Sequence, residues 1–231
     1  NWDTSNVLSM EEVFSGWPKF NGDISNWDTS RVESMYGMFK SSKYVGSHYT
    51  GDTSFNQDIS NWDTSRVKNM SEMFLGATSF NQDISNWDVG SVENMDYMFS
   101  GATSFNQNIN NWDVSNVKSM YYMFSNITKI GIVAFVGTYE FNWADSTAFN
   151  QPVGNWNVSN VVNMSGMFSG ATSFNQDISN WDVSNVDMSS IFNGATSFNQ
   201  PIGNLNVSNV KDLDGMFSGA TSFNQDISSW D

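Results

Sequence analysis

The sequence predicts a repeat solenoid of the α/β class, in which each turn of the chain adds one short parallel strand and one short helix. Two observations predict it. Tryptophan recurs at a nearly constant spacing of 25 residues, and one heptapeptide returns unchanged. A fixed period of this length is typical of repeat architectures, because each unit buries its apolar side only against its neighbours. The heptapeptide Gly-Ala-Thr-Ser-Phe-Asn-Gln begins at Gly76, Gly101, Gly170, Gly194 and Gly219.

The tryptophan position marks the phase of the repeat. Most steps are 24 or 25 residues, and two longer steps indicate insertions at about residues 42–51 and 126–145. We therefore expect one solenoid over residues 1–231, with about eight to nine turns, as a piece of a longer protein. The tryptophans expected to stack in a buried column are Trp27, Trp62, Trp87, Trp112, Trp156 and Trp181.

The strand of each turn is expected around the tryptophan. Trp87 and Val89 are two residues apart, so both point to the same side of an extended chain. Asp88 lies between them and is expected on the outer face. The parallel strands of successive turns would then stack about 4.8 Å apart.

The helix of each turn is expected directly after the strand. The apolar residues Val92, Met95, Met98 and Phe99 follow one another at steps of three, three and one, which is the spacing of one helix face. A serine before this run can cap the helix, and Gly101 lies where a left-handed residue would end it.

Asparagine and glutamine follow the phenylalanine of each turn, as in Asn81-Gln82, Asn106-Gln107 and Asn175-Gln176. Identical residues of stacked turns form columns along the axis. We therefore expect these amides to bond to the backbone and to their copies as an asparagine ladder, which is a structural role.

The composition restricts the classes of function. Hydrophobic residues make up 39% of the chain and aromatic residues 15%, which is enough for a continuous core. The 24 acidic and 9 basic residues give a net charge of −15, which disfavours nucleic acid and anionic membrane as partners. The chain has no cysteine and no run of 18 apolar residues, so we expect no disulfide and no membrane insertion by this segment.

Two acidic positions recur in the repeat. Carboxylates in register at the spacing of stacked strands repel one another, and a divalent cation such as calcium would relieve this repulsion. Calcium is the only cofactor that the sequence suggests. The candidate metal ligands are Asp58, Asp63, Asp83, Asp88, Asp177 and Asp182.

The two acidic positions vary together. "QDISNWDV" at residues 82–89 and 176–183 contrasts with "QPVGNWNV" at 151–158 and "QPIGNLNV" at 200–207. Either both carboxylates serve one function, or two ancestral types of unit were duplicated.

A catalytic function is not expected. The single histidine is His48, and no cysteine or nucleophile motif is present. Paired carboxylates also occur in β-helix-type carbohydrate-active enzymes, which leaves that alternative open. Such enzymes, however, gather unlike residues at one place, whereas the acids here recur in most turns.

The two insertions are the candidate partner-binding elements, because function in a repeat protein tends to reside in loops on a rigid scaffold. Both interrupt the repeat at the same position. Alternating apolar residues in the second insertion predict a β-hairpin, which either contacts a partner or folds back as a local lid. The candidate contact residues are Tyr44, His48, Tyr49, Phe135, Tyr139, Phe141 and Trp143.

The phrase "FNQDISNWDVSNVxxMxxMF" resembles the BspA-like repeat of bacterial surface proteins, also found in mycoplasma lipoproteins. The resemblance implies a right-handed, leucine-rich-repeat-like solenoid that is secreted or on the cell surface. It also implies a non-catalytic role in adhesion or assembly. The partner would be a protein or glycan on another surface, or further copies of the chain. A glycan- or calcium-binding module that uses the acidic columns is the alternative.

Overall fold

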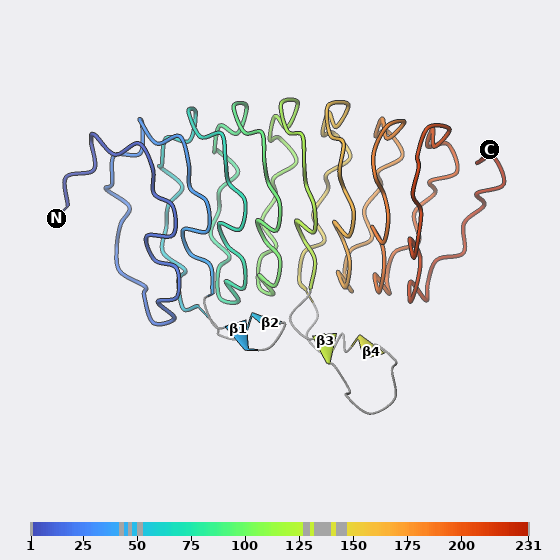
Figure 1. The fold of residues 1–231 in the computed structure, drawn as a ribbon, viewed down its shortest axis with the longest axis horizontal. Coiled ribbons are helices and arrows are strands. Elements are labelled where there is room, and N and C mark those ends of the chain that lie inside the picture. The colour runs from blue at the N-terminus through green and yellow to red at the C-terminus, as the bar shows by residue number, and fades with distance from the viewer. Residues whose placement is uncertain are drawn as a thin grey trace.

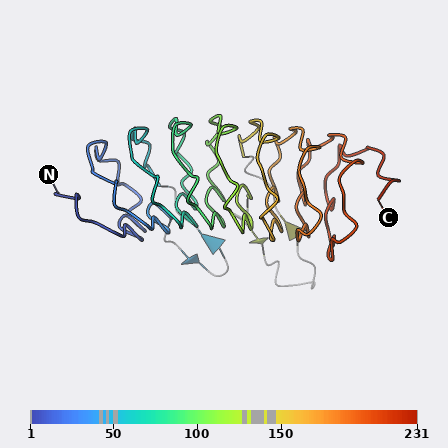
Figure 2. The ribbon, with the colours of Figure 1, turned by 90° about the horizontal axis from the view of Figure 1, so that it is seen from above.

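The computed structural model describes residues 2–41, 44–45, 48–49, 53–126, 130–131, 140–141 and 147–230. The chain winds into one elongated stack of turns with the two termini at opposite ends (Figure 1). Seen from above, each turn again lies beside the next one along the sequence (Figure 2). The described residues contain no helix. They therefore include no helix that is long and apolar enough to cross a membrane.

The prediction of one strand and one helix per turn is wrong, and with it the leucine-rich-repeat-like description. The strands are β1 (Tyr44–Val45), β2 (His48–Tyr49), β3 (Ile130–Gly131) and β4 (Glu140–Phe141). All four lie in the two insertions. The described turns of the stack contain only single parallel bridges, such as Asn94↔Ser119.

A seven-residue segment of each turn, which we call the ladder segment, joins successive turns through the backbone. Its first, third, fifth and seventh N–H groups donate to carbonyl oxygens of the next turn, except that residues 188–194 use only the third, fifth and seventh and residues 213–219 donate to no described turn. In residues 95–101 these bonds are Met95 N to Ser119 O (3.0 Å), Tyr97 N to Tyr121 O (2.8 Å), Phe99 N to Met123 O (2.9 Å) and Gly101 N to Ser125 O (2.8 Å). The ladder segments are 10–16, 35–41, 70–76, 95–101, 120–126, 164–170, 188–194 and 213–219.

The ladder explains why the predicted helix does not form. Its N–H groups bond to the next turn, whereas a helix needs them for the carbonyl four residues earlier. Left-handed residues orient these peptide groups along the stack: φ is 55° at Tyr97 and 69° at Gly101. A left-handed residue other than glycine costs about 1–2 kcal/mol, which the bonds between turns must offset.

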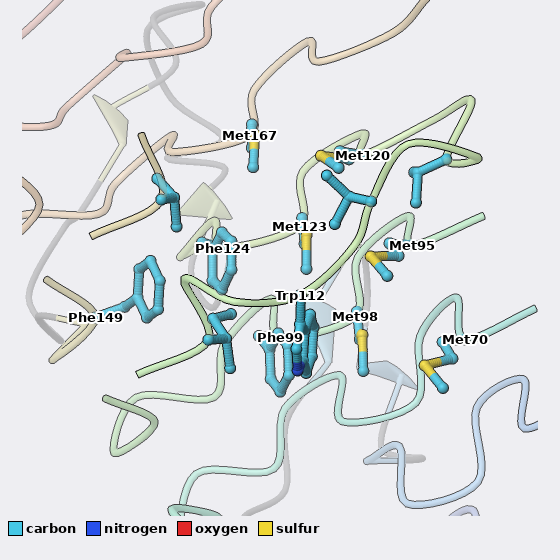
Figure 3. Packing of buried hydrophobic residues seen from close by; sticks show 14 of the residues in the cluster. Met70, Met95, Met98, Phe99, Trp112, Met120, Met123, Phe124, Phe149 and Met167 are labelled. Atoms are coloured by element: carbon cyan, nitrogen blue, oxygen red, sulfur yellow. The ribbon is translucent and has the colours of Figure 1, made fainter. Parts of the chain in front are cut away.

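Two columns of stacked phenylalanine rings run through the core. Phe99 lies 5.6 Å from Phe124 of the next turn and 4.0 Å from Phe105 of its own turn, with interplanar angles of 5° and 7°. Figure 3 shows methionines beside these rings, with Met95 and Met98 from one turn and Met120 and Met123 from the next. The stripe that suggested a helix face is therefore an apolar column facing neighbouring turns.

The tryptophans lie beside the two phenylalanine columns, as Trp87 does at 6.3 Å from Phe74. The indole N–H of Trp87 donates to the carbonyl of Ile59 in the preceding turn at 3.1 Å, which satisfies a polar group inside the core. Trp27 is only half-buried and stacks on the exposed Trp2 at 5.6 Å. The buried members of the predicted column are Trp62, Trp87, Trp112, Trp156 and Trp181.

The predicted asparagine ladder is confirmed. The backbone N–H of Asn106 donates to Oδ1 of Asn81 at 2.9 Å, and the amide of Gln107 donates to the same oxygen at 3.0 Å. The arrangement continues through Asn150 and Asn175. The recurring Phe-Asn-Gln sequence therefore serves the stack.

Candidate functional site

Both insertions leave the stack at the last position of a ladder segment. Turns without an insertion have glycine at this position, as at Gly101, whereas the two turns with an insertion have Ser41 and Asn126. Both residues are buried, and their N–H groups still donate to Leu75 O (2.8 Å) and Ser169 O (2.7 Å) of the next turn. The insertions therefore branch from an intact ladder, and their strand pairs lie along the same edge of the stack (Figure 1).

Each insertion contains an antiparallel strand pair. In the first, Tyr44 pairs with Tyr49 and Val45 with His48. In the second, β3 pairs with β4 through Ile130↔Phe141 and Gly131↔Glu140. The antiparallel pairing predicted for the second insertion is confirmed, whereas the pairing in the first was not predicted.

The candidate contact residues divide between these strands and the surrounding chain. Tyr44 lies in β1, His48 and Tyr49 lie in β2, and Phe141 lies in β4. Phe135, Tyr139 and Trp143 lie outside the described residues.

The chain re-enters the stack at a buried threonine after each insertion. Thr53 and Thr147 are both buried, and neither hydroxyl has a hydrogen-bond partner among the described residues. Thr172, in a turn without an insertion, has the same unpaired hydroxyl. The unpaired hydroxyl is therefore a feature of this threonine position in the repeat, with or without an insertion. It does not indicate a binding site at the insertions.

The recurring aspartates form local turns with the serine two residues later. Oδ1 of Asp63 accepts the hydroxyl of Ser65 at 2.6 Å and its backbone N–H at 3.0 Å, and these hydrogen bonds lower the pKa of Asp63. The backbone N–H and hydroxyl of Ser85 likewise lower the pKa of Asp83. The other candidate metal ligands accept a backbone N–H in the same way, in the pairs Asp58–Ser60, Asp88–Gly90, Asp177–Ser179 and Asp182–Ser184.

This use of the aspartates bears on the calcium hypothesis. Across residues 2–41, 53–126 and 147–230, no three acids or histidines lie close enough to hold a metal ion. The carboxylates serve as acceptors within their own turns, and the structure does not bring the six candidate ligands together as one site.

At the first acidic position, aspartate and the serine two residues later change together. Where aspartate is replaced by Pro152, the serine is replaced by Gly154, so the carboxylate acceptor and the hydroxyl donor are both absent. A Cβ atom on Gly154 would lie 2.6 Å from the carbonyl oxygen of Asp177 in the next turn. The second position keeps its acceptor, because Oδ1 of Asn157 accepts the N–H and hydroxyl of Ser159.

An ion-paired lysine on the outer side of the ladder was not predicted. Lys40 lies between Glu12 of the preceding turn and Glu72 of the following turn, and it contacts both. Burial by itself would lower the pKa of Lys40, but hydrogen bonds to the two glutamates raise it well above its usual value. The absence of a side chain at Gly37 provides space for Lys40, because a Cβ atom at Gly37 would lie 2.8 Å from the Lys40 side chain.

A tyrosine cluster in ladder segments 95–101 and 120–126 was also missed. Tyr97 and Tyr122 stack at 5.6 Å, and Tyr121 meets Tyr97 edge-on at 5.1 Å. Burial raises the pKa of Tyr97 and Tyr122 above the usual value for tyrosine. The signal was present in "MYYMF" at residues 120–124, which has tyrosine at both positions, whereas the other turns have a small or charged residue at one or both.

Comparison with known proteins identifies a family. The family model described as Mycoplasma protein of unknown function, DUF285, matches three times, over residues 1–48, 43–132 and 137–231. No curated protein and no solved structure matches the chain. The match confirms the predicted resemblance to a mycoplasma repeat family. It does not show that the repeat is of the BspA-like type. Because these matches cover nearly the whole chain, it belongs to the family described as Mycoplasma protein of unknown function, DUF285.

Proposed function

We propose that this chain is a non-catalytic scaffold that holds two inserted strand pairs at a set separation for contact with a partner. The observation that carries the proposal is their shared point of departure. Ser41 and Asn126 occupy the same ladder position three turns apart, and both remain bonded to the next turn. At the spacing of paired strands, three turns correspond to about 15 Å, which one partner can span.

The chemistry of the repeat supports a scaffold role. The amide of Asn81 and the carboxylate of Asp63 are each committed to hydrogen bonds that hold the stack or its turns. Residues that repeat in every turn give no turn a unique surface. The insertions do, and interface contacts in repeat scaffolds commonly come from such loops.

The proposed partner and location are those that the resemblance to BspA-like repeats implies. A BspA-like repeat acts on the cell surface or outside the cell, and its partner would be a protein or glycan on another surface. The net charge of −15 disfavours nucleic acid. The calcium-binding alternative and the carbohydrate-active enzyme alternative both rely on aspartates that already accept hydrogen bonds from the residue two positions later, so neither gains support.

Removal of one insertion tests the proposal. Residues 127–143 are deleted and the short connection of a clean turn is restored, with deletion of residues 42–51 as the matched variant. The readouts are thermal unfolding and binding of the purified chain to intact cultured cells and to arrays of glycans and matrix proteins. We expect both deletions to leave the melting temperature close to that of the parent, and at least one to abolish binding.

Two results would contradict the proposal. A folded double-deletion chain that binds as the parent does would remove the insertions from the function. The second result concerns the location. Protection of the protein from protease added to intact cells that express it natively would contradict a surface location, since a surface protein is cleaved and an internal one is protected.

A further inference from the structure

The junctions between successive turns are alike except for the last one in the chain. Each of the others has four ladder bonds and a further backbone bond just before the ladder segment, as from Glu93 N to Lys68 O at 2.8 Å. The last junction, between segments 188–194 and 213–219, has three ladder bonds and lacks the further bond. The series of parallel bridges between described turns also stops before it.

The first junction shows that a place at one end of the chain does not cause this loss. Its outer turn also has a described neighbour on one side only. It nevertheless keeps all four ladder bonds and the further bond, from Glu33 N to Leu8 O at 2.8 Å. Both junctions lie between turns that are described, so turns beyond either end do not enter the comparison. The difference therefore comes from the sequence at the last junction.

A missing residue explains the loss. Other turns have two residues between a valine and the first ladder residue, as in Val-Glu-Asn-Met at 92–95, whereas residues 186–188 read Val-Asp-Met. The carbonyl of the first of these two residues, such as Glu93, accepts from the next turn. Asp187 occupies the second place, because its carbonyl accepts from Met164 of the preceding turn at 2.9 Å. The turn therefore lacks the residue whose carbonyl would bond to the following turn.

Two N–H groups at the last junction have no acceptor among the described residues. They belong to Met188, which is the first residue of its ladder segment, and to Lys211 in the following turn. Met188 is fully buried, and a buried N–H group without an acceptor is unfavourable. The closed junction is therefore weakened by an unpaired donor as well as by lost bonds.

A second departure from the repeat weakens the same junction. In the turns from Trp62 to Trp181, the indole N–H donates to a carbonyl of the preceding turn, as from Trp181 to Val153 O at 3.0 Å. Leu205 replaces tryptophan in the following turn and has no such donor. The missing residue and Leu205 are separate changes in the sequence, and both remove hydrogen bonds between the same two turns.

Other contacts hold this junction on a different part of the turn. The backbone N–H of Asn224 donates to Oδ1 of Asn199 at 2.9 Å, and Phe217 stacks on Phe192 at 5.9 Å. The later part of the ladder segment is also bonded. Residues 205–213, in contrast, form no backbone hydrogen bond with the preceding turn. The two turns are therefore attached along one part and unbonded along another.

We propose that this junction is a hinge, at which residues 205–213 separate from the preceding turn while the other junctions stay closed. Opening breaks the fewest hydrogen bonds there, so it has the lowest free energy of the openings between described turns. The remaining contacts keep the two turns attached while the hinge is open. The hinge goes beyond the scaffold function. It separates the turns that carry both insertions from a last turn that can change direction.

Hydrogen exchange of the chain tests the proposal, with the first junction as the internal reference. The N–H groups of Ser190 and Phe192 donate across the last junction, and those of Glu12 and Phe14 donate across the first. We expect the protection factors of Ser190 and Phe192 to be lower by about tenfold or more, because several bonds of about 1 kcal/mol each are absent. Equal protection at the two junctions would overturn the proposal.

Repair of the sequence tests the assigned cause. Insertion of a serine after Asp187, combined with Leu205→Trp, restores the pattern of the other turns. We expect the protection factors of Ser190 and Phe192 to rise to those measured at the first junction. A repaired chain that folds and shows no gain in protection at these two residues would contradict the proposal.

Transfer of the missing residue to another turn gives an independent test. Deletion of Glu93 should create a second hinge and lower the protection factors of Tyr97 and Phe99 by about tenfold or more. Glu93→Ser is the matched control, because it removes the ion pair with Lys118 but keeps the length of the turn. Equal protection of Tyr97 and Phe99 in the deletion and in the control would overturn the proposal. None of these measurements depends on partner binding, so the scaffold function keeps its own test.

Discussion

Turns inside the stack and turns at its ends have nearly the same sequence but different surroundings. Trp87 is 3% exposed, whereas Trp2, at the same position of the first turn, is 68% exposed. Ladder segment 95–101 bonds to a turn on each side, while 10–16 and 213–219 each bond on one side only. The difference indicates that a turn gains its stability from its neighbours, as in other repeat proteins.

The largest difference between interior and end is expected for tryptophan. Trp87→Ala removes a buried ring from the core and should cost about 3–5 kcal/mol of unfolding free energy. Trp2→Ala should change it by less than about 0.5 kcal/mol, because the ring is exposed. Urea unfolding monitored by the fluorescence of the remaining tryptophans measures both. Equal effects would refute dependence on neighbouring turns.

A methyl group at Gly154 tests the close contact between interior turns. Its Cβ would lie 2.6 Å from a backbone carbonyl of the next turn, so Gly154→Ala should destabilise by about 1–3 kcal/mol. Gly90→Ser is the matched control, because Ser65 and Ser115 occupy that position in neighbouring turns. Thermal unfolding of the two variants compares them. A tolerated Gly154→Ala would mean that neighbouring turns can move apart at low cost.

The asparagine ladder offers a smaller interior-to-end comparison. Oδ1 of Asn106 accepts the N–H of Asn150 at 3.0 Å and the amide of Gln151 at 3.1 Å. Asn106→Ala leaves both donors unpaired and should cost about 1–2 kcal/mol. Asn224 is the last rung and accepts from no described residue, so Asn224→Ala should have little effect in the same unfolding assay. A larger loss at Asn224 would contradict the account.

Acid should weaken the aspartate turns, with a smaller effect. Serine hydrogen bonds lower the pKa of Asp63, Asp83 and Asp113 in the folded chain. Their stabilisation is therefore present above the unfolded pKa of about 3.9 and is lost as pH falls through the lower folded values. Protonation also relieves the repulsion among the carboxylates, which would raise the stability. The direction in which stability changes on acidification therefore shows which of the two effects is larger.

Melting temperatures between pH 6 and pH 2.5 measure this effect, and we expect them to fall below about pH 4. Asp113→Asn keeps the acceptor, as Asn157 does, and should lessen the fall. A melting temperature that rises steadily on acidification would show that charge repulsion outweighs the serine bonds.

Much of the core could be predicted from the sequence, but the backbone could not. The period of Trp87, Met95, Met98 and Phe99 identified residues that the structure buries. Their steps of three, three and one, however, fit a helix face as well as a ladder with left-handed residues at its third and seventh positions, such as Tyr97 and Gly101. The distinguishing signal was glycine within the predicted helix, at Gly37, Gly166 and Gly215, where it costs about 1 kcal/mol relative to alanine.

The candidate site was predictable to a smaller extent. Insertion positions followed from the broken period, and alternation in the second insertion indicated antiparallel strands. The serine partners of the aspartates were missed, although the spacing Asp-x-Ser favours such turns. Lys40 and Tyr122 could not be placed, because their contacts arise between turns and depend on which residue each neighbouring turn carries.

Hydrogen exchange of the ladder amides tests the central claim, that bonds from turn to turn hold the fold, most directly. It is measured at a concentration and salt level where the chain is monomeric. We predict strong protection of the N–H groups of Met95, Tyr97 and Phe99, and near-unprotected exchange for Gly215 and Phe217, which face the open end. Equal protection of the two sets, or fast exchange at Tyr97 and Phe99, would contradict the account.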